Sequence, residues 1–321
     1  MNSYQQLSAI FDERFNARQF PQKPATLYDA AQYLLQLKGK RIRPVMCLMA
    51  NEMFGEIVED AFHVATAMEL FHNFTLIHDD IMDKAPLRRG MPTVHAKFGE
   101  STALLAGDVM LVASYENLNN VRIDYLPRVL SIFNKTAKEV CEGQQLDIDF
   151  ETMSDVSLDD YLEMITLKTS VTLAASLRLG AILGGAGAGN QEHLYEFGKN
   201  LGIAFQVQDD YLDAFGDPEK FGKKPGGDII ANKKTFLLLQ ALKVAPKAQQ
   251  QELRQLLKKD QDNKIETVLN IYKSCNLDEW AKELKQKYFR IAMEHMEEIA
   301  VVSFRKKTLE ELANYLMERD V

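Results

Sequence analysis

Two short clusters of aspartate are the residues best suited to chemistry in this chain, DDIMD at 79–83 and DDYLD at 209–213. Both follow the pattern DDxxD. Residues four apart share one face of a helix, so the first and last carboxylates of a cluster point the same way, about 6 Å apart along the axis. Three like charges within five residues repel one another, and their hard oxygen atoms suit Mg²⁺ or Mn²⁺ rather than zinc or copper. Two such clusters predict two walls of one cavity, with metal ions between them.

The residues around the clusters argue against the simplest alternative, in which each DDxxD is surface charge on a solvated helix. Apolar side chains flank both clusters: Leu76, Ile77, Ile81 and Met82 around the first, and Phe205, Val207, Tyr211, Leu212 and Phe215 around the second. Carboxylates that enter apolar surroundings have to be paired or bind a metal. The flanking sequence therefore favours a metal site over a solvated face.

Basic motifs accompany the acidic clusters. GKRIRP at 39–44 begins a predicted helix, where backbone N–H groups and the helix dipole favour anions. LRRG at 87–90 follows the first cluster, and GKKPGGD at 222–228 and NKKT at 232–235 follow the second. Arginine binds phosphate oxygens through a planar fork, and lysine binds them as a point charge. One such run alone could be a solvated patch, but a basic loop beyond each acidic helix predicts an assembly of cations, metals and diphosphates.

The first basic motif and a histidine together suggest a further anion site. Lys40, Arg41 and Arg43 are expected to cluster around the N-terminus of the predicted helix. His72 lies seven residues before Asp79, close to the same helical face. It could be a core-edge histidine with a satisfied hydrogen bond, or it could donate a hydrogen bond to a second phosphate group.

The elements that must position these residues are predicted to be helices almost throughout. Apolar residues recur at three- and four-residue spacing, and we find no convincing alternating strand and no βαβ unit. The glycine run 184–189 lacks the Lys-Ser/Thr of a phosphate loop and follows no strand, so it is interpreted as an interhelical turn. We expect one all-α domain covering residues 1–321, with the C-terminal stretch 277–318 wrapping one side. The predicted helices span 26–37, 43–54, 58–83, 99–119, 125–146, 157–183, 191–215, 232–244, 248–258, 264–274, 277–301 and 308–318.

Composition narrows the class of protein. The 321 residues are 46% hydrophobic and 26% charged, as in ordinary globular proteins, and the net charge of −8 argues against a general nucleic-acid binder. Cys47, Cys141 and Cys275 fit no zinc spacing and no disulfide framework, so we expect three packed thiols in a reducing compartment. We find no signal peptide and no apolar run long enough to span a membrane. These features predict a cytoplasmic enzyme.

The motifs taken together resemble the trans-isoprenyl diphosphate synthases, or polyprenyl synthetases, most of all the short-chain geranylgeranyl and farnesyl enzymes. They occur in the family's order over residues 39–235, and the C-terminal third matches only in helical character and length. The resemblance implies an isoprenoid synthase-like bundle of long helices around a central active-site cavity. The matching segments are GKRIRP (39–44), FHNFTLIHDDIMD (71–83), LRRG (87–90), AGD (106–108), EGQQLD (142–147), LKT (167–169), FQVQDDYLD (205–213), GKKPGGD (222–228) and NKKT (232–235).

The resemblance also implies a role for each matching residue. Those that would bind three Mg²⁺, for which Mn²⁺ could substitute, are Asp79, Asp83 and Asp209, with Asp80 and Asp213 as ligands or support. Those that would contact the allylic diphosphate are Arg88, Lys168, Lys223 and Lys233. Those that would hold the diphosphate of isopentenyl diphosphate are Lys40, Arg43, His72 and Arg89. Thr169 and Gln206 would line the reacting carbons and steady a developing allylic cation.

The reaction implied is the head-to-tail 1′-4 condensation of isopentenyl diphosphate with dimethylallyl, geranyl or farnesyl diphosphate. Neutralising the leaving diphosphate makes the allylic substrate electrophilic, so the protein needs no nucleophile. Product length should be set below the first cluster, where Phe74 and Phe71 precede Asp79 by five and eight residues. They could be ordinary core aromatics. In the family, one aromatic at the fifth position beside a non-aromatic neighbour, here Thr75, resembles geranylgeranyl diphosphate synthases and implies a C20 product, with C15 next.

Other activities remain open at this point. A class I terpene cyclase also uses DDxxD, Mg²⁺ and an all-α fold, but it would not need GKRIRP, His72 and the second Arg of LRRG. A squalene-type head-to-head synthase is disfavoured for similar reasons. A non-catalytic subunit of a heteromeric synthase often lacks one acidic cluster, and both are intact here. The resemblance also implies a homodimer.

Overall fold

The computed structural model of the protein describes residues 1–16, 19–37, 39–217, 226–258 and 263–318. These residues are almost entirely helical, and the two short strands form one antiparallel hairpin. The predicted all-α class is confirmed. The chain divides into two compact units: the first comprises 1–133, 175–192 and 300–309, and the second comprises 134–174, 193–299 and 310–321. The expectation of a single domain stays a prediction.

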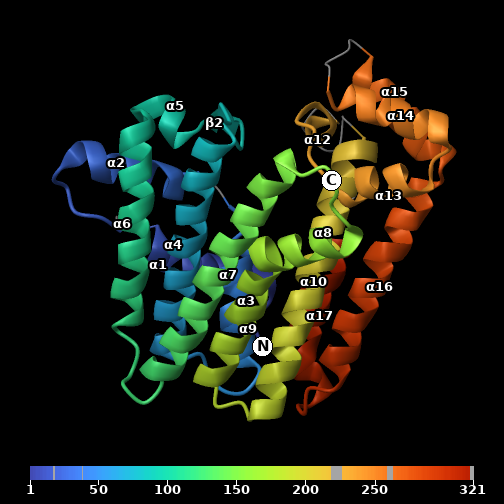
Figure 1. Ribbon diagram of the computed structural model, residues 1–321. Coiled ribbons are helices and arrows are strands. Elements are labelled where there is room, and N and C mark those ends of the chain that lie inside the picture. The colour runs from blue at the N-terminus through green and yellow to red at the C-terminus, as the bar shows by residue number, and fades with distance from the viewer. Residues whose placement is uncertain (17–18, 38, 218–225, 259–262, 319–321) are drawn as a thin grey trace. The chain divides into compact units, whose positions relative to one another are not determined.

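The first unit is built around the long helix α4, Glu59–Met82, which packs against α3 and α6 (Figure 1). It contains no glycine or proline, and it buries side chains from Val64 and Met68 through Phe71 to Ile77. Asp83 caps the helix, and Lys84 follows with a φ of 50°. The other elements of this unit are α1 (Tyr4–Phe15), α2 (Ala25–Gln36), α3 (Ile42–Glu52), β1 (Leu87–Arg88), β2 (Met91–Pro92), α5 (Val94–Phe98) and α6 (Glu100–Leu118).

The second unit has its own apolar core. Phe236 is fully buried, with its ring 5.9 Å from that of Tyr161 and 5.6 Å from that of Trp280. The elements of this unit are α8 (Leu158–Ile165), the π-helix η1 (Thr166–Ser170), α12 (Gly227–Ile230), α13 (Phe236–Val244), α14 (Lys247–Leu256), α15 (Lys264–Ser274) and α16 (Leu277–Glu297). Four helices contribute residues to both units: α7 (Leu126–Thr152), α9 (Val171–Leu183), α10 (Ala188–Phe215) and α17 (Ser303–Met317).

Most predicted helices are confirmed, and the differences lie mainly at motifs. The continuous helix expected over 157–183 is interrupted by the π-helix, and the helix expected from 232 begins at Phe236. Helix α1 and the hairpin of β1 and β2 were not predicted, and strands of two residues leave no alternating pattern in a sequence. The glycine run 184–189 does contain the turn between α9 and α10, as predicted.

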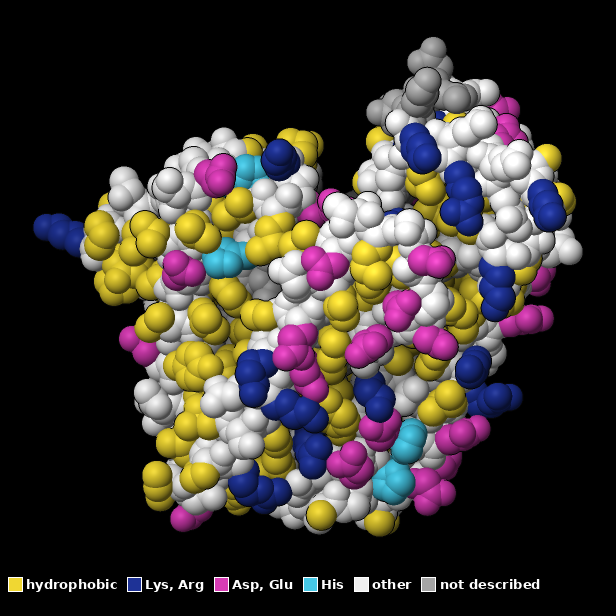
Figure 2. Space-filling model, in the orientation of Figure 1, with side chains coloured by type: hydrophobic (Ala, Val, Ile, Leu, Met, Phe, Trp, Pro, Cys, Tyr) yellow, Lys and Arg dark blue, Asp and Glu magenta, His cyan; other side chains and the backbone are white. Residues whose placement is uncertain are grey.

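Surface features complete the description. Apolar side chains gather over α6 (Figure 2), where Leu104, Leu105 and Val112 are each about half exposed. The expectation of three packed thiols was wrong for Cys141, which is exposed on α7. No helix within the described ranges is long and apolar enough to cross a membrane.

Candidate active site

The first acidic cluster occupies the C-terminal end of α4, and its middle carboxylate faces inward. Asp80 is 2% exposed and accepts two hydrogen bonds from Arg88, from Nε to Oδ2 and from Nη2 to Oδ1, both at 2.8 Å. A bidentate pair of this kind is geometrically strict. Asp79 is half-buried and Asp83, the helix cap, is exposed. The arginine of the hairpin thus holds the middle aspartate, while the outer two lie nearer to solvent.

Helix α6 supports the same end of α4 through the segment AGD at 106–108. His78, immediately before the cluster, lies with Nε2 3.1 Å from the carbonyl oxygen of Leu104 and 3.7 Å from a carboxylate oxygen of Asp108. A Cβ added at Gly107 would overlap the ring of His78. The glycine therefore lets α6 approach the residue that precedes Asp79. His78 was not identified from sequence, although AGD was noted as a motif.

Three of the four residues expected to bind a second diphosphate, Arg43, His72 and Arg89, come together in the first unit. His72 Nε2 lies 3.1 Å from Arg43 Nη1, and since guanidinium only donates, Nε2 is the acceptor. Burial, followed by the charges of Arg43, Arg89 and Arg88, holds the pKa of His72 well below its usual value. Burial also lowers the pKa of Arg43, to about 10. A neutral histidine among arginines marks a region of positive potential that an anion would relieve.

Local backbone geometry shapes this basic cluster. Arg89 has a φ of 55°, and its Nη1 donates to the carbonyl oxygen of Leu37 at 2.9 Å. A Cβ at Gly39 would come within 3.1 Å of the same Nη1, so the glycine leaves room for the guanidinium. Lys40 has an exposed side chain, and its backbone carbonyl accepts a hydrogen bond from the hydroxyl of Tyr4.

Arg41 departs from the expectation that it would join the anion site. Its side chain points into the unit and is 5% exposed. It forms ion pairs with Glu69 and with Asp12, and Nη2 donates to the carbonyl of Leu35 at 3.2 Å. The φ of 49° at Arg41 turns the chain into α3. This arginine therefore anchors the motif, whereas the side chain of Lys40 is exposed and that of Arg43 contacts His72.

The second acidic cluster, near the end of α10, also buries its middle carboxylate, but with neutral partners. Asp210 accepts from the Tyr161 hydroxyl at 2.7 Å and from Gln206 Nε2 at 2.9 Å. Burial raises its pKa to about 6, against the lowering effect of both hydrogen bonds. Tyr161 comes from α8 and had no sequence signal, because a tyrosine at helical spacing is typical of a core.

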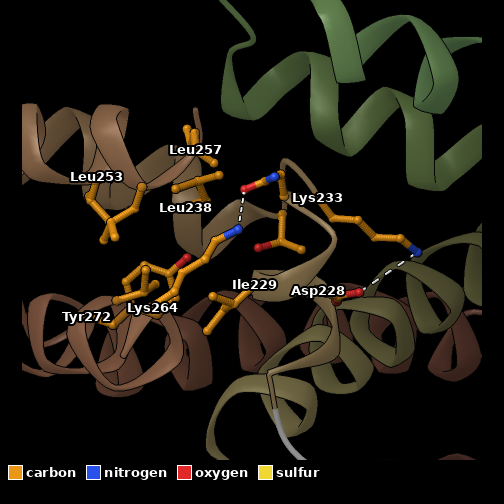
Figure 3. A pocket seen from close by; sticks show the side chains of 12 residues that line it. Asp228, Ile229, Lys233, Leu238, Leu253, Leu257, Lys264 and Tyr272 are labelled. Atoms are coloured by element: carbon orange, nitrogen blue, oxygen red, sulfur yellow. Dashed lines mark hydrogen bonds and ion pairs between the residues drawn. The ribbon is translucent and has the colours of Figure 1, made fainter. Parts of the chain in front are cut away.

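The backbone of residues 226–228 contacts the last aspartate of this cluster. Asp213 Oδ2 accepts from the backbone N–H of Asp228 at 2.9 Å, and its carbonyl accepts from Gly226 N–H at 2.6 Å. Lys233 Nζ lies 3.8 Å from Asp228 Oδ1 (Figure 3). Burial is the main cause that raises the pKa of Asp228 to about 7. Lys223 falls outside the described residues.

The segment LKT lies in the π-helix, which glycines on two neighbouring helices accommodate. A Cβ at Gly143 of α7 would overlap the backbone of Lys168, and one at Gly202 of α10 would come within 2.7 Å of Ser170 Cα. π-helical turns of this kind are frequent at functional sites. Lys168 Nζ donates to Asp147 Oδ2 at 2.6 Å.

One hydrogen-bond chain joins the π-helix to the second acidic cluster. Thr169 Oγ1 donates to Gln206 Oε1 at 3.3 Å, and the amide nitrogen of Gln206 donates to Asp210. Gln206 is thus held at both ends, which fixes the direction of its amide. Thr169 and Gln206, which the sequence analysis assigned together, are adjacent in the structure.

The two candidate chain-length residues belong to an aromatic cluster in the first unit. The ring of Phe71 lies 5.7 Å from Phe74 and 5.3 Å from Phe133, and the ring of Phe74 lies 4.7 Å from His78. Phe71 is fully buried, whereas Phe74 is only half-buried. The cluster begins one turn before the first acidic cluster.

The donor chemistry fits divalent cations held between carboxylates and diphosphate rather than in a protein cage. Within the described chain, no three His, Cys, Asp or Glu side chains converge in a way that would hold a metal by themselves. Mg²⁺ commonly takes one or two carboxylates and completes its shell with water and substrate phosphates. The outer aspartates of each cluster, one helical turn apart, are donors of that kind.

Comparison with known proteins identifies the family. The polyprenyl synthetase profile matches residues 24–275. A short chain isoprenyl diphosphate synthase of Methanothermobacter thermautotrophicus is 35% identical over all of this chain and 98% of its own length. A geranylgeranyl diphosphate synthase of Methanosarcina mazei is 37% identical over 93% of this chain and 91% of its own. A crystal structure of geranylgeranyl pyrophosphate synthase superposes with a TM-score of 0.94 at 42% identity, covering 99% of both chains.

The chain belongs to the polyprenyl synthetase family and is a prenyltransferase. The isoprenoid synthase-like fold expected from the motifs is confirmed.

Proposed function

We propose that this enzyme condenses isopentenyl diphosphate head-to-tail with an allylic diphosphate, giving geranylgeranyl diphosphate as its main product. The observation that carries the proposal is the basic cluster of Arg43, His72 and Arg89, which provides two guanidinium groups besides that of Arg88, the residue bonded to Asp80. A cyclase that ionises one allylic diphosphate has no use for a second diphosphate site. An enzyme that joins two diphosphates needs both.

The outer carboxylates are proposed to bind the metal. Asp79, Asp83 and Asp209 would hold three Mg²⁺ ions, with Asp80 and Asp213 supporting them, and Mn²⁺ could substitute. When bound, these ions neutralise the leaving diphosphate and so lower the barrier to its departure. Asp80 acts through Arg88, because its own oxygens already accept that guanidinium. Asp213 likewise acts through the backbone of Asp228.

Basic side chains are proposed to bind the two diphosphates. The residues proposed for the allylic diphosphate are Arg88, Lys168, Lys223 and Lys233. Lys168 can keep its bond to Asp147 and still contact phosphate, because an ammonium has three donors. The residues proposed for isopentenyl diphosphate are Lys40, Arg43, His72 and Arg89. His72 enters this site as a neutral ring, and the arriving anion would raise its pKa.

Carbon–carbon bond formation is proposed to occur next to Thr169 and Gln206. The Gln206 amide is held between Thr169 and Asp210, so its oxygen has a fixed direction beside the reacting carbons. A preorganised dipole of this kind stabilises a developing allylic cation without reorganising. Proton loss then restores a double bond, and the departing diphosphate is the proposed acceptor of that proton.

Product length is proposed to be set by Phe74, with Phe71 behind it. Phe74 is half-buried and packs edge-to-face against His78, which directly precedes the first acidic cluster. The names of the Methanosarcina mazei relative and of the superposed structure support C20. Farnesyl diphosphate, C15, is the alternative product.

A second copy of this chain is proposed to cover the apolar surface of α6. Leu104, Leu105 and Val112 share that surface and are each about half exposed (Figure 2). A large apolar surface of this kind is typical of an interface between subunits. A homodimer would bury these side chains. The free thiols Cys47, Cys141 and Cys275 suit the reducing cytoplasm in which we propose the enzyme works.

The decisive experiment incubates the purified protein with labelled isopentenyl diphosphate and each allylic primer, with and without Mg²⁺, and sizes the products. Mg²⁺-dependent formation of C20 is expected, and Phe74→Ala should yield longer chains by opening the space below the metal site. A protein without turnover would instead be a non-catalytic subunit. Cyclic hydrocarbons made from one allylic diphosphate would indicate a cyclase, and an unchanged product ladder in Phe74→Ala would remove Phe74 from chain-length control.

A further inference from the structure

Helix α15 begins with a lysine that is almost completely buried. Lys264 is 5% exposed, and its Nζ donates to Asn232 Oδ1 at 2.8 Å and to the carbonyl oxygen of Ile230 at 3.3 Å (Figure 3). Ile230 is the last residue of α12, so the ammonium meets the negative end of that short helix. Asn232 follows in a left-handed conformation with a φ of 57°. One side chain thus fixes the turn by which the chain leaves α12.

The next residue of α15 contacts the other end of the same segment. Gly226 has a φ of 91°, and a Cβ there would lie 2.9 Å from the Ile265 side chain. The backbone N–H of Gly226 donates to Asp213 at the second acidic cluster. The first turn of α15 therefore contacts the segment 226–232 at its beginning and at its end.

Of the two charged residues near these contacts, Asp228 lies between them and Lys233 directly follows the second one. The backbone N–H of Lys233 donates to the carbonyl of Asp228 at 3.0 Å, and their side chains approach to 3.8 Å. Asp228 N–H is bonded to Asp213. A shift of Asn232 would move Lys233, which is its immediate neighbour in the chain.

Stability alone does not explain a lysine at position 264. Lys264 lines a cavity of about 20 Å³, enough for one water molecule, together with apolar side chains such as Leu253 and Val268 and polar ones such as Thr235. Burying an ammonium costs free energy that an apolar side chain of similar length would not. The ammonium does what an apolar side chain cannot, since it bonds both the end of α12 and Asn232.

We propose that Lys264 is a positioning residue that holds Lys233 where it contacts the allylic diphosphate. The inference rests on the proposed function, in which Lys233 binds that substrate. It assigns a task to part of the C-terminal third, for which the sequence motifs gave none. Lys264 does not touch substrate, and its effect is confined to the allylic side of the reaction.

The test uses Lys264→Met, which keeps the length of the side chain and removes its charge. Lys273→Met is the matched control, because Lys273 is exposed on the same helix. For Lys264→Met, the KM for farnesyl diphosphate should rise about 10-fold, the loss expected for a hydrogen bond to a charged group. The KM for isopentenyl diphosphate should change less than about 2-fold. Calorimetric titration with farnesyl diphosphate and Mg²⁺, without the second substrate, should show the same loss of affinity.

Two further variants separate positioning from folding. Asn232→Gly keeps the left-handed backbone and removes only the acceptor of the Lys264 bond, so it should reproduce the farnesyl diphosphate effect even if Lys264→Met folds poorly. In a Lys233→Ala background, Lys264→Met should add little to the KM for farnesyl diphosphate. Additive effects in this double-mutant cycle, equal rises in both KM values, or an unchanged affinity in Asn232→Gly would each overturn the proposal. If wild type and Lys273→Met show no turnover at all, the proposed function fails instead.

Discussion

The two DDxxD clusters have the same spacing, but the middle aspartate of the first is bonded to a charged side chain and that of the second to neutral side chains. Asp80 is held by the guanidinium of Arg88, a permanent cation that donates two hydrogen bonds. Asp210 is held by a hydroxyl and an amide, which donate hydrogen bonds but carry no charge. Burial accordingly raises the pKa of Asp210 to about 6. Identical motifs therefore do not imply identical chemistry, and the partners decide which charge each cluster carries.

The largest expected effect comes from removing the cation of the first cluster. Arg88→Leu would leave Asp80 buried without its counter-ion, which destabilises a protein by about 3–5 kcal/mol. Turnover should fall by about 10³-fold or more, because Arg88 is also proposed to bind the leaving diphosphate. Chemical denaturation and steady-state kinetics measure the two losses.

Arg88→Lys supplies the matched control for that loss. Lysine keeps the charge but cannot make the bidentate pair. Arg88→Lys should therefore recover most of the stability that Arg88→Leu loses, but a smaller part of the turnover. If Arg88→Leu were as stable as wild type, the contrast between the clusters would have no energetic meaning.

A smaller effect is expected from removing the neutral donor of the second cluster. Tyr161→Phe deletes the hydroxyl that bonds Asp210 and should cost about 1–3 kcal/mol of stability. The bond lowers the pKa of Asp210, so its loss should raise that pKa further. The acid limb of the pH–rate profile should then move to higher pH. An unmoved limb would mean that Asp210 does not control it.

The smallest expected effect is a pH-dependent change of thermal stability. Burial raises the pKa of Asp228 to about 7, whereas an aspartate of the unfolded chain titrates near about 4. The folded state thus binds this proton more tightly, and the stability that it contributes is complete below pH 4 and is lost as the pH rises through 7. Without Mg²⁺, Asp228→Asn should raise Tm at pH 8 by on the order of a few degrees, and the gain should shrink towards pH 4.

Asp124→Asn, at an exposed loop position, controls that comparison for the loss of one negative charge. Scanning calorimetry across this pH range measures both variants. A gain for Asp228→Asn that did not vary with pH would contradict the assignment of a raised pKa to this carboxyl.

Two features of the sequence, its apolar periodicity and the order of its motifs, predicted the helices and several residues of the site. Helical spacing predicted most helices, and the motifs named Arg43, His72 and Arg89 before the structure brought them together. The sequence could not show that Arg41 points inward to Glu69 and Asp12, because three neighbouring basic residues look alike until the backbone turns at one of them. The roles of the site residues stay predictions, as does the single-domain organisation.

The sequence also could not reveal contacts between residues that are far apart in the chain. Tyr161 reaches Asp210 from another helix, and Lys264 reaches Asn232 across a segment with no recognised motif. The π-helix was missed because its extra residue disturbs the period over a single turn, within a sequence that is otherwise helical on both sides.

The π-helix determines how this part of the chain responds to the deletion of a single residue. The π-helix is a wide turn that holds one residue more than a regular α-helical turn, and Lys168 and Thr169 lie on it. Deleting one residue of Thr166–Ser170 would let the run become regular α-helix with the flanking helices close to their present faces, because the wide turn already absorbs one extra residue. The fold should therefore tolerate this deletion better than a deletion from a regular α-helix, which rotates the following residues by about 100°, but the deletion would remove the turn that carries Lys168 and Thr169.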